Sequence, residues 1–170
     1  MTPALSFKTF RPLALMATLF AALSLGGCGV NNIPTYEQSA KAAWAEVQNQ
    51  YKRRTDLIPN LVESVKGFAE QERKVLTDVT EARAKATSVQ IPADILTNPE
   101  AMKQYQDAQN TLGGALRQLL AVVERYPDIK SGQNFLALQS QIEGTENRIS
   151  IARRDYIQAV RQYNTEITTF

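Results

Sequence analysis

Residues 40–86 read AKAAWAEVQNQYKRRTDLIPNLVESVKGFAEQERKVLTDVTEARAKA, and this stretch decides the fold. Its apolar side chains recur in steps of four and three, as they do along helices that pack side by side. A strand has a side-chain period of two and cannot follow this spacing. Of the fourteen positions on this line, which we call the seam, all but Arg54 and Glu72 are apolar. The seam consists of Ala40, Trp44, Val47, Tyr51, Arg54, Ile58, Leu61, Val65, Phe68, Glu72, Val75, Val79, Ala82 and Ala86.

Pro59 interrupts the seam. A proline inside a helix removes one backbone hydrogen bond and bends the helix. Because the seam keeps its phase across Pro59, we expect one helix over residues 36–86, kinked at this proline, rather than a reversal of the chain there.

Two further helices follow a loop at residues 87–98. Asn98 suits an N-cap, and Pro99 and Glu100 suit the first helical turn. This second helix is expected to end at Tyr126, before Pro127, and a third begins near Phe135 after a short turn. The sequence thus predicts an all-α fold, an antiparallel bundle of long helices. There are three helices if the first is only kinked at Pro59, and four if it splits there.

Arg54 is a charged residue on an apolar seam. A guanidinium taken out of water needs a carboxylate partner. Asp56, two residues on, points to a different face of the helix. If the second helix folds back along the first, Tyr126 ends level with Pro59 and Asp128 becomes a candidate partner, whereas Glu146 lies further along the bundle.

These placements suggest a polar layer formed by Arg54, Asn60, Asp128 and Asn134. The layer would set the register between helices, with a partner-binding surface as the alternative. The candidate set for the layer and its surroundings is Arg54, Asp56, Pro59, Asn60, Tyr126, Asp128, Asn134 and Phe135.

The same layout leaves part of the first helix without a partner inside the chain. The unmatched side chains are Trp44, Val47 and Tyr51. Either the first helix splits at Pro59 and a four-helix bundle covers them, or these three side chains, which we call the partner seam, pair with another subunit.

Residues 1–27 are typical of a secretory signal peptide. Lys8 and Arg11 precede an apolar run over residues 12–25, which is shorter than the roughly 20 residues that span a bilayer. The run ends in Leu-Gly-Gly-Cys, which resembles a bacterial lipobox and predicts cleavage before Cys28 and lipidation of its thiol. Residues 28–35 then form a tether and residues 36–170 the helical domain. An uncleaved anchor with an incidental cysteine is the alternative.

This signal predicts a lipid-anchored protein of the bacterial cell envelope that faces the periplasm. Gly29 follows the cysteine, where an aspartate would resemble an inner-membrane retention signal. The absence of an aspartate at position 29 favours the outer membrane over the inner membrane.

Composition excludes several classes of function. The chain has no histidine and one cysteine, which removes His-based acid–base catalysis, Ser-His-Asp triads and nearly every zinc site. Without residues 1–27 it carries 17 basic and 17 acidic residues, so the runs at 52–54 and 153–154 do not predict nucleic-acid binding. We expect no enzymatic activity, no cofactor and no metal.

Several motifs resemble the LemA family over residues 33–170. They are AAWAEVQNQYKRRTDLIPNLVESVKGFA (Ala42–Ala69), TEARAKA, ERYPDIK, NFLALQ and TENRISIARRDY followed by YN. The resemblance implies an envelope-anchored antiparallel helical bundle of bacteria with no established biochemical activity. Many relatives keep their apolar N-terminal helix as an uncleaved anchor, and this chain departs from them by its lipobox.

Two functional hypotheses remain. The first is a non-enzymatic lipoprotein that binds or scaffolds other proteins, or associates with itself. The second is a carrier or sensor of a small molecule, which would need a pocket with convergent polar groups. The regular seams predict a filled core instead, and an internal pocket beside Arg54 would favour the second.

Overall fold

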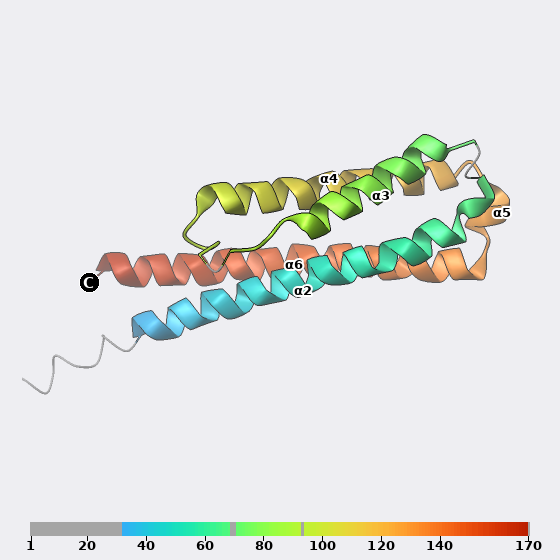
Figure 1. Cartoon of the computed structure of the whole chain (residues 1–170). Helices are drawn as coiled ribbons and strands as arrows, with labels where there is room; N and C mark the ends of the chain where they lie inside the picture. Colours follow the sequence, from blue (N-terminus) through green and yellow to red (C-terminus); the bar gives the residue numbers. More distant parts are fainter. Residues whose placement is uncertain (1–31, 69–70, 93, 170) are drawn as a thin grey trace, which may run out of the picture. The chain divides into compact units, whose positions relative to one another are not determined.

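The structure, a computed structural model, describes residues 32–68, 71–92 and 94–169 (Figure 1). Within these ranges all regular elements are helical, which confirms the predicted all-α class. The elements are α2 (Asn32–Ser64), the 3-10 turn η2 (Lys66–Phe68), α3 (Arg73–Ser88), α4 (Pro99–Val123), the short α5 (Pro127–Lys130) and α6 (Gln133–Thr169). The predicted signal peptide and Cys28 lie outside the described residues. Residues 32–35, predicted as part of a tether, belong to α2.

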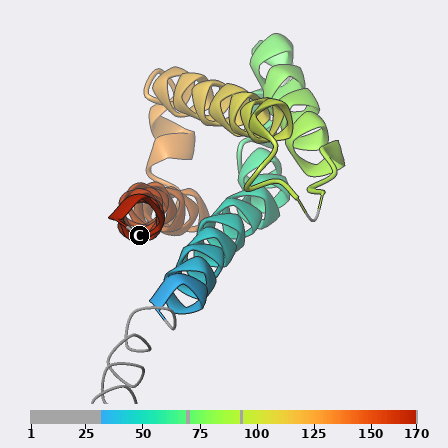
Figure 2. The same cartoon turned by 90° about the vertical axis from the view of Figure 1, so that its left-hand side faces the viewer.

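The chain forms two compact units. One is Ala42–Ile157, and the other combines the described helical ends at residues 32–41 and 158–169. Within Ala42–Ile157, α2, α3, α4 and α6 run alternately in opposite directions, with α3 beside α4 and α2 beside α6 (Figures 1 and 2). This unit is therefore an antiparallel bundle of four long helices.

The first helix is shorter than predicted. α2 continues through Pro59 and ends at Ser64, and α3 begins at Arg73. The expected continuous helix over residues 36–86 is therefore wrong, and the break lies after Ser64 rather than at Pro59. The spacing could not locate the break, because the seams on both sides of it share one period. Folding back buries Leu61 and Val65 against Val79 of α3.

Pro59 contributes to the contact between α2 and α3. It lies on the exposed side of α2 and has no N–H to donate to the carbonyl of Thr55, four residues earlier. Instead, Arg83 of α3 donates its Nε–H to this carbonyl over 2.9 Å. A polar group that the proline leaves unpaired thus joins two helices.

The start of α4 agrees with the sequence. The side chain of Asn98 accepts a hydrogen bond from the N–H of Ala101 at 3.1 Å, and Pro99 is the first helical residue. The C-terminal end differs, because α4 stops at Val123 and Tyr126 is the N-cap residue of α5. Pro127 is the first residue of α5 and starts this short helix, as Pro99 starts α4.

The predicted partner seam is internal. Trp44 is 6% exposed and Val47 and Tyr51 are also buried, all within one apolar cluster that includes Tyr105 of α4 and Ile149 of α6. The reversal after Ser64 brings α4 alongside the first half of α2, so these side chains are covered within the chain. A second apolar cluster joins α2, α3, α4 and α6 near the α5 turn.

Among the residues that the structure describes, no helix combines the length and apolar character needed to cross a membrane.

Replacing Trp44 tests the internal position of this seam. Trp44→Glu should lower the free energy of unfolding by about 3–5 kcal/mol or more, because it removes a buried aromatic side chain and buries a charge. Ala45→Glu, on the exposed side of the same helix, should change it by less than about 0.5 kcal/mol. Urea unfolding followed by circular dichroism gives both values. An unchanged unfolding midpoint with altered sedimentation would instead place Trp44 between subunits.

Candidate functional site

Arg54 is the centre of a buried polar layer. Its side chain is 3% exposed. Nη1 donates to Oε1 of Glu146 at 2.8 Å, and Nη2 donates to the backbone carbonyl of Gln109 at 2.7 Å and to its side-chain oxygen at 2.8 Å. The carboxylate and two amide oxygens compensate a charge that would otherwise cost several kcal/mol to bury. The layer therefore joins α2, α4 and α6.

The surroundings of Arg54 fit a planar cation. Its guanidinium lies 5.1 Å from the ring centroid of Tyr51, a distance at which an aromatic face attracts a positive charge. On α4, a Cβ added at Gly113 would lie 3.3 Å from Nη1 of Arg54, which is closer than ordinary packing allows. The absence of a side chain at Gly113 thus gives the guanidinium room against the α4 backbone.

The predicted partner of Arg54 is wrong. Asp128 is exposed and lies at the α5 turn, whereas Glu146 of α6 forms the ion pair. Distances counted along one continuous first helix place Glu146 too far from Arg54, because the reversal after Ser64 changes which part of α6 faces Arg54. Gln109, a polar residue between the apolar positions Tyr105 and Leu112 of the second predicted helix, was the available signal for a polar neighbour.

The remaining residues of the predicted layer lie elsewhere. Asn60 and Asn134 are exposed and line one surface hollow, and Asp128, Asn134 and Phe135 line a neighbouring one, so these four gather without Arg54. Phe135 is buried in the larger core cluster.

Two further predicted residues make separate polar contacts. Asp56 is exposed and pairs with Lys52 at 2.9 Å. The hydroxyl of Tyr126 donates to Glu72 at 3.2 Å, and Arg125 pairs with the same carboxylate at 2.6 Å. Glu72, the second polar position on the seam, therefore has partners at the other end of α4.

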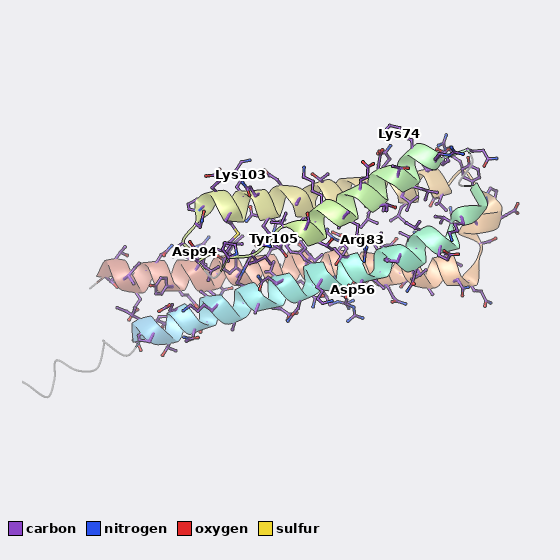
Figure 3. All side chains as sticks on the ribbon, in the orientation of Figure 1. Asp56, Lys74, Arg83, Asp94, Lys103 and Tyr105 are labelled. Carbon is purple, nitrogen blue, oxygen red and sulfur yellow. The ribbon has the colours of Figure 1, made fainter. Side chains whose placement is uncertain are left out.

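Aromatic rings continue the layer towards Trp44. The ring of Tyr105 lies edge-on to Trp44 and to Tyr51, each with 5.7 Å between centroids, and Tyr156 lies 5.2 Å from Trp44. Figure 3 places Tyr105 and Arg83 on the sides of their helices that face α2, and Asp56 on the outer side of α2. Such edge contacts add to the free energy of burying the rings.

Burial changes the acidity of these tyrosines. It raises the pKa of Tyr105 from 10.0 to about 12, with a smaller contribution in the same direction from Tyr51 and an opposing one from Arg54. Burial also raises the pKa of Tyr51, against the opposing charges of Arg153 and Arg54. The folded bundle thus favours the neutral phenols.

A hollow of about 400 Å³ opens beside the layer. Tyr51, Tyr105 and Gln109 form its inner side, and Val89 and Ile91 belong to its outer part. Elsewhere in the described part of the chain, no group of three or more Asp, Glu, Cys or His residues is placed to hold a metal ion. The arrangement can hold helices in register and can receive a small polar group, but it offers no paired nucleophile and base.

These features define the class of protein as an antiparallel helical bundle with an Arg–Gln–Glu layer around a buried arginine. The sequence model of the LemA family matches residues 43–170, and the chain belongs to this family.

Curated relatives agree with this assignment. The chain is 26% identical over 154 residues to magnetosome protein MamQ 2 of Paramagnetospirillum magneticum, covering 81% of this chain and 57% of the relative. It is 25% identical over 140 residues to protein LemA of Metamycoplasma hominis, covering 82% and 60%. Magnetosome protein MamQ of Magnetospirillum gryphiswaldense is 23% identical over 154 residues, covering 81% and 57%. The chain thus spans less than two thirds of the length of these relatives.

Removing the charge of Glu146 tests the buried layer. Glu146→Gln should lower the free energy of unfolding by about 1–2 kcal/mol, because Arg54 loses its ion pair while the 40% exposure of Glu146 lets water compensate in part. Glu143→Gln, one turn earlier and exposed, should change it by less than about 0.5 kcal/mol. Equal effects in urea titrations of the two variants would contradict a special role for Glu146.

Alkaline unfolding tests the buried tyrosine. A phenol with a pKa of about 12 when folded and 10.0 when unfolded stabilises the fold fully below pH 10 and loses that contribution between pH 10 and 12. The contribution is about 2–3 kcal/mol. Tyr105→Phe should therefore flatten the fall in stability over this pH range, whereas Tyr163→Phe, at a half-exposed position, should leave it steep. Identical pH profiles of the two variants would contradict the assignment.

Proposed function

We propose that the chain is a non-enzymatic, lipid-anchored protein of the bacterial cell envelope whose helical bundle binds other proteins. The anchor is Cys28, at the end of a signal of lipobox type, and the domain faces the periplasm, with the outer membrane favoured by Gly29. The relatives come from bacteria, which supports a bacterial envelope as the setting.

The observation that carries the interaction role is the outer face of α6. Five large apolar side chains are exposed among the described residues, and three of them lie on α6 within the unit Ala42–Ile157. They are Leu136, Ile151 and Ile157, with exposures of 40–55%, whereas Ile167 belongs to the other unit and the fifth is Ile91. Ile151 and Ile157 flank Arg153 and Arg154 in the sequence, and exposed apolar side chains close to one another favour a protein contact over a purely solvated surface.

Charge on the same helix indicates the chemistry of the partner. Arg148, Arg153 and Arg154 outnumber Asp155 between residues 148 and 157. A surface groove of about 380 Å³ runs here, with Ile149 and Ile157 beside Arg153 and Arg154, and its one carboxylate, Glu146, is paired with Arg54. These side chains suit a partner segment that combines apolar and acidic residues, because each arginine can pair with a carboxylate at the rim of an apolar contact.

The buried layer gives little support to catalysis. Nη1 and Nη2 of Arg54 are used between helices, and the apolar clusters on either side are packed. The surface of the bundle is therefore where recognition of another protein would take place.

Photo-crosslinking in cells tests the α6 face. A photoreactive residue at position 157 should give a discrete crosslinked product in the wild-type background, and the double charge reversal Arg153→Glu with Arg154→Glu should abolish it, because the acidic segment is repelled. The same photoreactive residue at exposed Gln118 of α4 should give no such product. A product that persists after charge reversal, or one that also forms from position 118, would contradict this partner surface.

A small-molecule carrier or sensor is the alternative function. The hollow beside the layer favours it, because Tyr51 and Gln109 both line this hollow and contact Arg54. The two functions use different surfaces. A carrier would lose its ligand on substitution of Thr55 or Gln109 and keep it after charge reversal at Arg153 and Arg154.

A further inference from the structure

The second compact unit of the chain is a pair of helical ends. Its described part consists of residues 32–41 of α2 and 158–169 of α6. The two run antiparallel, and Nδ2 of Asn32 donates to Oε1 of Glu166 at 3.1 Å. The first residue of α2 therefore lies next to the last turn of α6.

Large apolar and aromatic side chains of this pair remain in partial contact with solvent. Ile33 and Tyr36 of α2 are half-buried, as are Val160 and Tyr163 of α6, and Ile167 is 45% exposed. In the described part of this unit, Ala40 alone is as buried as the core residues of the bundle. Two helices can cover each other along one line only, so the remaining apolar sides need a third surface.

The charges of this helical end balance. Lys41 and Arg161 are basic and Glu37 and Glu166 are acidic, and Lys41 pairs with Glu37 on the same helix. With two basic and two acidic side chains, this surface has no strong electrostatic attraction to an anionic membrane and no strong repulsion from it. Its contact with lipid would depend on apolar area and on the tyrosine rings.

The position of this end in the sequence suggests what covers it. Three residues separate Cys28 from Asn32, so the Cα atoms of the two lie at most about 14 Å apart. The polar headgroup layer on each side of a bilayer is roughly 5–8 Å thick. A lipid on Cys28 would therefore hold this pair of helical ends at the membrane surface.

We propose that the helical end formed by residues 32–41 and 158–169 inserts Ile33, Tyr36, Tyr163 and Ile167 into the interface of the membrane that carries lipidated Cys28. The inference rests on the lipid anchor of the proposed function. Tyrosine suits this depth, because its ring is apolar and its hydroxyl remains near water. The insertion fixes this helical end at the membrane surface, in addition to the tether at Cys28.

A second copy of the chain is a weaker candidate for the same surface. The pair offers few large apolar side chains, Ile33, Tyr36, Val160, Tyr163 and Ile167, against the roughly 20–30 residues per partner of a standard interface. A bilayer has no such requirement of area once a lipid chain already holds the protein at its surface.

The single cysteine of the sequence makes a direct test possible. In the lipidated full chain the thiol of Cys28 is blocked, so Tyr163→Cys introduces a unique site for a nitrobenzoxadiazole dye. The labelled protein is reconstituted in phosphatidylcholine vesicles, with or without brominated acyl chains. We expect a blue-shifted emission that the brominated chains quench. The matched variant Gln118→Cys, on an exposed position of α4, should keep the emission of a dye in water.

Further arms separate the other outcomes. An emission from position 163 that resembles the one from position 118 would overturn the insertion. A blue shift that varies with protein concentration and resists bromine quenching would also overturn it, because it indicates a second copy of the chain. A blue shift that requires anionic lipid and low salt would overturn it as well. Labelling of cells with an alkyne analogue of palmitate, with Cys28→Ala as the control, tests the anchor alone. Absence of label on wild-type protein would contradict the anchor, whereas label without insertion would contradict this inference only.

Discussion

The buried positive charge of Arg54 is the constraint on which the rest of the bundle depends. A guanidinium at 3% exposure is tolerated only where acceptors surround it, and here they come from Gln109 on α4 and Glu146 on α6. Apolar seams of Val, Leu, Ile and Ala residues could slide past each other by a turn with a small loss of packing. Arg54 finds its acceptors in one register, so we infer that it selects this alignment over its competitors.

The turn after Ser64 decides which helices surround that charge. It converts one long seam into two that face each other and lets α4 cover Trp44, Val47 and Tyr51. Pro59 supports this arrangement from within α2, because the carbonyl of Thr55 that it leaves free accepts a hydrogen bond from Arg83 of α3. The proline therefore acts as a contact between helices rather than as their boundary.

Arg54 and Gln109 are paired between helices inside the bundle, whereas charged and apolar side chains remain exposed on its surface. Inside the bundle Nη1 and Nη2 of Arg54 are held by Glu146 and Gln109, so we propose the surface of α6 and the helical ends near the predicted anchor as the places of recognition. A packed bundle is well suited to such a role, since its rigidity keeps exposed side chains in fixed positions. Membership of the LemA family agrees with an all-helical domain and leaves the molecular task to be measured.

Local chemistry in the sequence determined the helical class, the N-cap at Asn98 and the seams, because helix period and capping depend on neighbours within a few residues. The sequence also singled out Arg54 as a buried charge that needs partners. Only the tertiary structure decided where the first helix ends, that Glu146 rather than Asp128 pairs with Arg54, and that Trp44 is covered within the chain. These outcomes depend on contacts between residues far apart in the chain. A seam with one unbroken period is compatible with a straight helix and with a hairpin, and the free energy of packing decides between them.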